Sequence, residues 1–236
     1  MGSGYLWADD TAPAHVRSAE PGGLVRMPSP RPPWLVVYTA PGRVLVTGWP
    51  GRLWRVEIMP PAAEPERAAL AEITARIAPG AGYTHASRVE VVAEVSPALP
   101  FGAHGDAVAR VVEAGQALDE PTAHRLAEAR RPEAGRAYVH AWLRWSAEPR
   151  GWGVNSPVGS GLGLLGTVVQ ASARLRGGPG AWVVDGDGEN VVAEPWCSAY
   201  GALREAALAY GAPHLVDGAA RELLAAPWDT VYGPLR

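Results

Sequence analysis

Two Pro-Gly pairs, Pro41-Gly42 and Pro50-Gly51, divide a stretch rich in β-branched and aromatic residues into three runs. Proline presets φ at the first central position of a tight turn, and glycine adopts the positive φ that the next position requires. The runs are Trp34–Ala40, Arg43–Trp49 and Arg52–Met59, and the last two alternate side chains as half-buried strands do. The sequence therefore predicts a three-stranded antiparallel meander over residues 34–59.

Periodic segments continue after the meander. Residues 88–95 alternate as a strand, and residues 181–185 and 190–194 are expected to form a hairpin. Apolar residues recur at helical spacing elsewhere, and helices are predicted at 64–78, 108–118, 120–131, 157–176, 195–210 and 217–225. Residues 136–146 fit both periodicities, and we favour a helix there. This order predicts an α+β fold, in which a small antiparallel sheet packs with helices and the C-terminal portion is mainly helical.

The domain organisation follows from where periodicity begins. Residues 1–33 carry many prolines and no periodic pattern, so we expect an irregular, Pro-rich arm. Residues 34–236 are expected to form a single α+β domain, with a subdivision near 97–135 as the alternative.

All 21 basic residues other than histidine are arginines, and the chain has no lysine. This excludes the standard forms of several enzyme classes, because P-loop nucleotide hydrolases, protein kinases and pyridoxal-phosphate enzymes each need a lysine amine. Asparagine, isoleucine and phenylalanine, whose codons are also A/T-rich, are scarce as well. The bias therefore indicates a bacterium with a high-G+C genome.

The charge and the apolar pattern narrow the classes of partner. A net charge of −3 argues against a nucleic-acid-binding protein that relies on bulk basicity. No apolar run is long enough for a transmembrane helix, and the N-terminus lacks the pattern of a signal peptide. We therefore expect a cytoplasmic protein that binds neither nucleic acid nor membranes.

Ten tryptophans stand beside these arginines, and the two residue types pair well because a guanidinium stacks on an indole ring. The densest basic stretch follows residue 120. Arginine and tryptophan are also common hot spots of protein interfaces. We therefore expect a protein partner to bind the following residues: Arg125, Arg130, Arg131, Arg136, Trp142, Arg144 and Trp145.

Ser156-Pro157 is a typical helix start, and the glycine-rich turn after it is a candidate ligand site at Ser156, Gly159, Gly161 and Gly163. Residues 161–166 match G-x-G-x-x-G, but no strand precedes them as a dinucleotide fold requires. Residues 40–48 and 157–163 resemble two motifs of the GHMP small-molecule kinases, which implies a phosphate-binding loop. Leu164-Leu165 replace that family's serine pair, so anion binding at the helix start is retained and kinase chemistry is not.

Cys197 is the best-placed nucleophile, because it lies in the first turn of a predicted helix, and His140 and His214 are its candidate bases. The histidines show no ligand spacing, so neither a metal nor a cofactor is predicted. Asp185-Gly186-Asp187 resembles the start of a calcium loop, but Asn190 and Trp196 occupy the positions that need glycine and glutamate.

No catalytic constellation assembles from these residues. We therefore favour a non-catalytic interaction or regulatory protein, which binds a protein partner through its Trp/Arg surface. The alternative is a cofactor-independent enzyme or small-molecule binder with a Trp-lined pocket. A cavity with converging polar groups would favour the alternative, whereas a flat Trp/Arg patch would favour the partner-binding protein.

Overall fold

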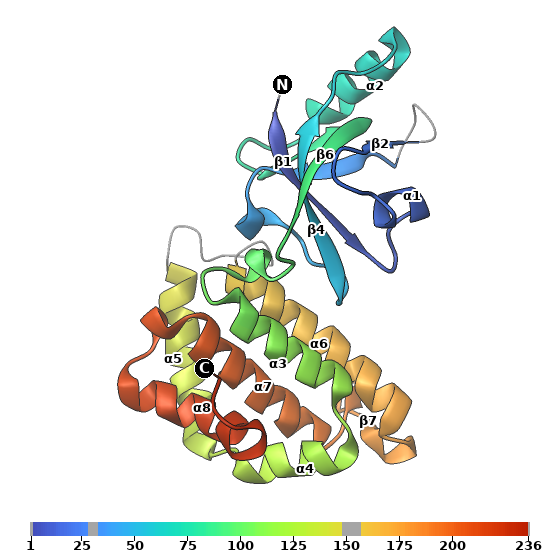
Figure 1. The fold of residues 1–236 in the computed structure, drawn as a ribbon. Helices are drawn as coiled ribbons and strands as arrows, with labels where there is room; N and C mark the ends of the chain where they lie inside the picture. The colour runs from blue at the N-terminus through green and yellow to red at the C-terminus, as the bar shows by residue number, and fades with distance from the viewer. Residues whose placement is uncertain (1, 28–32, 148–156, 236) are drawn as a thin grey trace. The chain divides into compact units, whose positions relative to one another are not determined.

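The computed structural model describes residues 2–27, 33–147 and 157–235, without the side chains at 145–147 and 157–160. The chain divides into two compact units, Met1–Pro100 and Phe101–Arg236. This boundary falls within the 97–135 range named above. Each unit is described separately (Figure 1).

The first unit is built on a six-stranded antiparallel sheet, whose strands lie in the order β2-β6-β4-β1-β3-β5. In chain order the strands are β1 (Ser3–Asp9), β2 (Leu24–Arg26), β3 (Leu35–Tyr38), β4 (Gly51–Ile58), β5 (Tyr83–Ala86) and β6 (Arg88–Val95). The short helix α1 (Ala14–Arg17) follows β1, and α2 (Glu64–Thr74) follows β4. With the helical second unit, this sheet confirms the predicted α+β class.

The prediction of irregular structure for residues 1–33 is wrong for β1, α1 and β2, which all lie in this range. Residues 3–9 form an inner strand, which pairs with β4 at seven positions from Ser3 to Asp9. Leu6 and Ala8 are buried on the face that packs against α1. The strand partners lie some 45 residues later in the sequence, so no local pattern near the prolines could reveal the pairing.

The predicted meander is also wrong in its connections. Its first and third runs are β3 and β4, but β1 lies between them. The middle run forms a 3₁₀ turn at Pro41–Arg43 followed by extended chain outside the sheet. Val44 and Val46 are buried there whereas Leu45 is exposed. The alternating pattern therefore predicts correctly which side chains are buried, although this segment has no strand partner in the described sheet.

The core of the first unit lies on one face of the sheet, under α1 and the chain that leads to β2. Trp54, Val56, Val89 and Val91 are completely buried. The pairing of β4 with β6 shifts register after Arg55, so Val92 has no partner on β4, and its side chain is 37% exposed.

The second unit is a helix bundle with a small hairpin. Its helices are α3 (Gly105–Ala117), α4 (Glu120–Ala129), α5 (Pro132–Ala147), α6 (Pro157–Arg176), α7 (Trp196–Gly211) and α8 (Gly218–Tyr232). Helix α7 packs against each of the other five (Figure 1), and its alanine-rich faces are almost entirely buried. The hairpin pairs β7 (Trp182–Val184) with β8 (Asn190–Val192), as predicted.

The residues that mark helix starts in the sequence predicted these helices well. Asp119 caps α4 by accepting a hydrogen bond from the Thr122 N–H, and α5 is a helix rather than a strand. Helix α8 continues beyond the predicted end at 225 and passes Pro227, because burial of Leu224 and Trp228 offsets the lost backbone hydrogen bond. Within the described ranges, none of the helices combines the length and apolar character needed to cross a membrane.

Candidate functional site

Arg130, one of the predicted partner-binding residues, is held inside the helical unit. Its Nε and Nη2 donate to the carboxylate of Glu205 on α7, with Nη2 to Oε1 at 2.7 Å. Glu205 is 1% exposed. Burial raises the pKa of Glu205, and the Arg130 hydrogen bonds oppose that rise. Arg130 therefore contributes to the folded structure of the bundle as well as to its surface.

Arg204 lies one residue before Glu205, and sequence reasoning did not single it out. Its Nη2 donates to the Tyr138 hydroxyl at 2.6 Å, and its guanidinium lies 4.7 Å from the Tyr138 ring centroid. The Tyr200 ring centroid is 5.2 Å away on α7. The sequence signal was an arginine followed directly by a glutamate within an otherwise apolar helix.

Two other arginines of the predicted basic surface form hydrogen bonds within the helical unit. Arg125 donates to Thr122, and Arg144 donates to the Leu215 carbonyl oxygen. Trp142 is 37% exposed and stacks on Tyr138, with ring centroids 6.2 Å apart. Arg131 and Arg136 are exposed. The Trp145 side chain lies outside the described part of the chain.

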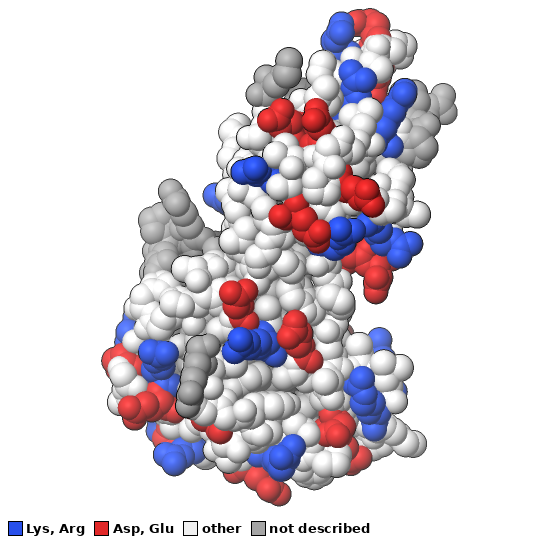
Figure 2. Space-filling model, viewed as in Figure 1, with Lys and Arg blue, Asp and Glu red and all other residues white. Residues whose placement is uncertain are grey.

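Charges of both signs are mixed over the visible face of each unit (Figure 2). Arginine side chains lie close to aspartate and glutamate side chains there, as the near-neutral composition suggests. Such a surface does not favour a polyanionic partner.

The structure does not place a histidine beside Cys197. Cys197 is exposed in the first turn of α7 and lines a cavity of about 350 Å³ with Trp182, Tyr200 and the β7–β8 hairpin. The described residues that line this cavity include no histidine. His140 is exposed on α5, and His214 lies in the turn before α8. The predicted Cys–His arrangement is therefore not assembled.

The glycine-rich start of α6 has a packing role where it is described. A side chain at Gly161 would collide with Val108 of α3, so this glycine lets the two helices approach closely. Gly163 is exposed. Ser156 lies outside the described residues, as do the surroundings of Gly159. In the described part of the chain, no group of three His, Cys, Asp or Glu residues is arranged to hold a metal.

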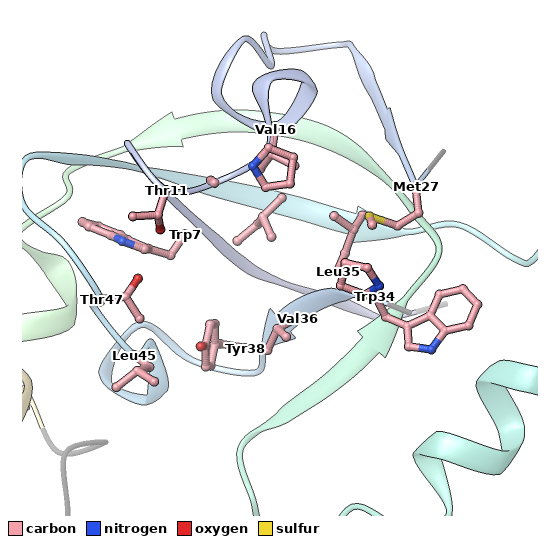
Figure 3. Close-up of a pocket in the computed structure, with 14 residues that line it drawn as sticks. Trp7, Thr11, Val16, Met27, Trp34, Leu35, Val36, Tyr38, Leu45 and Thr47 are labelled. Carbon is pink, nitrogen blue, oxygen red and sulfur yellow. The ribbon is translucent and has the colours of Figure 1, made fainter. Parts of the chain in front are cut away.

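The first unit contains a pocket of about 400 Å³ that no sequence motif indicated. It lies among β1, α1, β3 and the chain after Pro41–Arg43, and all the described residues that line it are uncharged. Figure 3 shows it as an elongated space, with Trp7, Thr11 and Thr47 at one end and Met27, Leu35 and Trp34 at the other.

The pocket forms because two neighbouring strands part. Strands β1 and β3 pair only at Tyr5 with Tyr38 in the described sheet, and beyond this pair they diverge. Leu6 and Trp7 of β1 and Leu35 of β3 lie on the diverging side and line the pocket. Burial raises the pKa of Tyr38, which forms part of the wall.

A buried carboxylate supports the Trp7 end of the pocket. Asp9 accepts hydrogen bonds from the hydroxyls of Thr11 at 2.6 Å and Thr47 at 2.5 Å, and from Trp7 Nε1 at 3.3 Å. Burial alone would raise the pKa of Asp9, but these hydrogen bonds outweigh it and hold the pKa below 3.8. The ionised carboxylate thereby fixes three side chains that line the pocket.

Trp7 is further held by its packing. Its ring stacks on Trp49 at 6.1 Å and 18°, and the absence of a side chain at Gly51 makes room for it. The pocket wall at this end is therefore rigid before any ligand arrives.

In comparisons with known proteins, no protein-family model, curated protein or solved structure matches this chain.

Proposed function

We propose that the first unit binds a small, neutral, mainly apolar molecule in the pocket between β1 and β3. The observation that carries this proposal is the lining, which combines two indole rings and a phenol ring with aliphatic side chains and two threonine hydroxyls, and contains no charged group among the described residues. Ligand pockets commonly have volumes of about 300–1,000 Å³ and apolar walls with a few polar groups.

The two ends of the pocket suit different parts of such a ligand. The Thr11 and Thr47 hydroxyls donate to Asp9, so their oxygens still have lone pairs for a hydrogen-bond donor on the ligand. The opposite end, with Met27 and Trp34, offers mainly apolar contact. A ligand with one N–H or O–H group and an apolar body fits both ends.

Binding of indole to the full-length protein tests the proposal. Leu45 is 36% exposed at the rim of the pocket, so Leu45→Trp adds bulk there without disturbing the core. We expect this variant to weaken indole binding at least tenfold in a ligand-detected NMR titration. Leu24→Trp is the matched control, because Leu24 is 57% exposed on β2 and does not line the pocket. Equal binding by all three proteins would refute the proposal.

A second candidate function is protein binding on the outer face of α5, the helix that carries Arg136 and Trp142 of the predicted partner-binding residues. Val139 and Leu143 are 52% and 59% exposed and lie one turn apart, with Arg136 and His140 beside them on the same helix. Exposed apolar residues flanked by polar ones favour a partner surface. Leu143→Asp should abolish capture of a specific partner from the source cell, whereas Leu175→Asp on α6, at a leucine that is 79% exposed, should not.

A further inference from the structure

A second cavity, of about 330 Å³, lies in the helical unit between α5 and α7. Arg130, Arg204 and Glu205 line it together with Tyr138 and Val139. Two glycines, Gly135 and Gly201, complete the described part of its wall. The missing side chain of Gly201 lets the Arg130 guanidinium pack against α7, since a Cβ there would lie 2.7 Å from the guanidinium carbon.

The charges that line this cavity do not cancel. Arg130 and Arg204 contribute two positive charges, and Glu205 contributes one negative charge, which leaves one net positive charge. The salt bridge of Glu205 is made with Arg130, at 2.7 Å. Among the described residues, Arg204 forms no salt bridge, although its charge acts on the Glu205 carboxylate and opposes the rise in its pKa. Its direct contacts are the Tyr138 hydroxyl and the rings of Tyr138 and Tyr200.

The hydrogen-bonding capacity of both guanidinium groups is also incompletely used. A guanidinium has five N–H donors. The Arg130 donors that form hydrogen bonds are on Nε and Nη2, and all of these hydrogen bonds are accepted by Glu205. Arg204 Nε is buried and has no hydrogen-bond partner in the described part of the protein. A buried donor without an acceptor is unfavourable, so a ligand that supplies acceptors here would be bound favourably.

We infer that this cavity binds a small monocarboxylate, whose carboxylate pairs with Arg204 and the remaining donors of Arg130. The planar guanidinium suits the two oxygens of a carboxylate. The apolar body of the ligand lies against the Tyr138 ring and Val139. This site is in the second unit and does not depend on the function proposed for the first.

The net charge also selects the class of anion. One positive charge is balanced by one carboxylate. A phosphate dianion would bring a second negative charge into a cavity that already contains the Glu205 carboxylate, and like charges at short range repel. Inorganic phosphate is therefore expected to bind at least tenfold more weakly than a monocarboxylate.

Titration of the full-length protein with sodium benzoate tests this inference, with benzamide as the uncharged counterpart. We expect Arg204→Gln to weaken benzoate binding at least tenfold. Arg110→Gln, which changes an exposed arginine on α3, should leave binding unchanged. Benzamide should bind the unaltered protein at least tenfold more weakly than benzoate. Benzoate binding that is absent, or that Arg204→Gln leaves unchanged, would overturn the inference.

A second readout covers the case in which Arg204→Gln fails to fold. In the unaltered protein labelled with ¹⁵N at arginine Nε, benzoate should shift the Arg204 Nε resonance and leave that of Arg110 in place. A saturable Arg204 shift supports the site. If the Arg204 resonance does not move at saturating benzoate, the site is not a carboxylate site.

Discussion

Arg130 and Glu205 are 75 positions apart in the sequence, yet the Arg130 guanidinium contacts both oxygens of the Glu205 carboxylate. The pair joins the C-terminal end of α4 to the interior of α7, the helix around which the bundle packs. Glu205 is almost completely buried, whereas 31% of the Arg130 side chain remains exposed. Both members of the pair line the cavity between α5 and α7, and the buried Glu205 carboxylate also lies in the core of the bundle.

Removing the buried carboxylate should destabilise the helical unit. Glu205→Ala leaves Arg130 without its counter-charge, and breaking a buried pair from one side costs about 3 kcal/mol. Hydrogen–deuterium exchange should show the loss of protection across α4 and α7. Glu222→Ala, at an exposed glutamate on α8, should change exchange little. Unaltered protection in Glu205→Ala would mean that the ion pair does not support the bundle.

The effect of Gly201→Ala on the free energy of unfolding should change sign between two backgrounds. Alanine is a better helix former than glycine by about 1 kcal/mol, but its Cβ would lie 2.7 Å from the Arg130 guanidinium. Because Glu205 holds that guanidinium in place, we expect a net loss of about 1 kcal/mol in the unaltered protein. In an Arg130→Ala background the collision is gone, and Gly201→Ala should stabilise by about 1 kcal/mol. The same sign in both backgrounds in chemical denaturation would contradict this account.

The helices of the second unit were predictable because their start signals are local. Asp119 caps α4, Pro157 begins α6, and the glycines around residue 187 mark the β7–β8 turn. Each signal acts within a few residues of the element it specifies, so the sequence alone contained the necessary information. The order of the strands in the first unit depends instead on pairing between β1 and β4, which local patterns do not encode.

The candidate sites were likewise predictable only in part from the sequence. Arg130 was identified as chemically important, but its partner Glu205 lies on another helix and could not be assigned to it from spacing. A Trp-lined pocket was one alternative from composition. Which of the ten tryptophans would line one was not predictable, because Trp7 and Trp34 meet the same cavity only where β1 and β3 part.

Asp9 should make the first unit sensitive to acid. The pKa of Asp9 is held below 3.8 in the folded protein, so its ionised form adds stability above that value, and the stability is lost as pH falls through the lowered pKa. Asp9→Asn replaces an acceptor with a donor that faces Thr47 or Thr11, which should cost about 2 kcal/mol at neutral pH. The difference between the two proteins should shrink below pH 3.8. A difference that stays constant with pH would show that the charge of Asp9 is unimportant.

Gly51 should be intolerant of a side chain. A Cβ at this position would overlap the six-membered ring of Trp7, which is already stacked on Trp49. Gly51→Ala should destabilise the first unit by about 2 kcal/mol, as overpacked substitutions do, and should weaken indole binding by moving Trp7. Gly2→Ala is the control, since its Cβ would make an ordinary 3.7 Å contact with Ile58. Equal stability of the two variants in thermal denaturation would disprove the close packing at Trp7.

Binding of a neutral, mainly apolar ligand in the pocket between β1 and β3 should be visible in the methyl NMR spectrum of the protein labelled with ¹³C at methionine methyl groups. Met27 lines the pocket, whereas Met59 lies at the end of β4 outside it. Indole should shift the Met27 signal in a saturable way, with a Kd on the order of 1 mM for a ligand of this size. The Met59 signal should stay in place. If indole leaves the Met27 signal unmoved, or shifts both signals equally without saturation, the pocket does not bind this class of ligand.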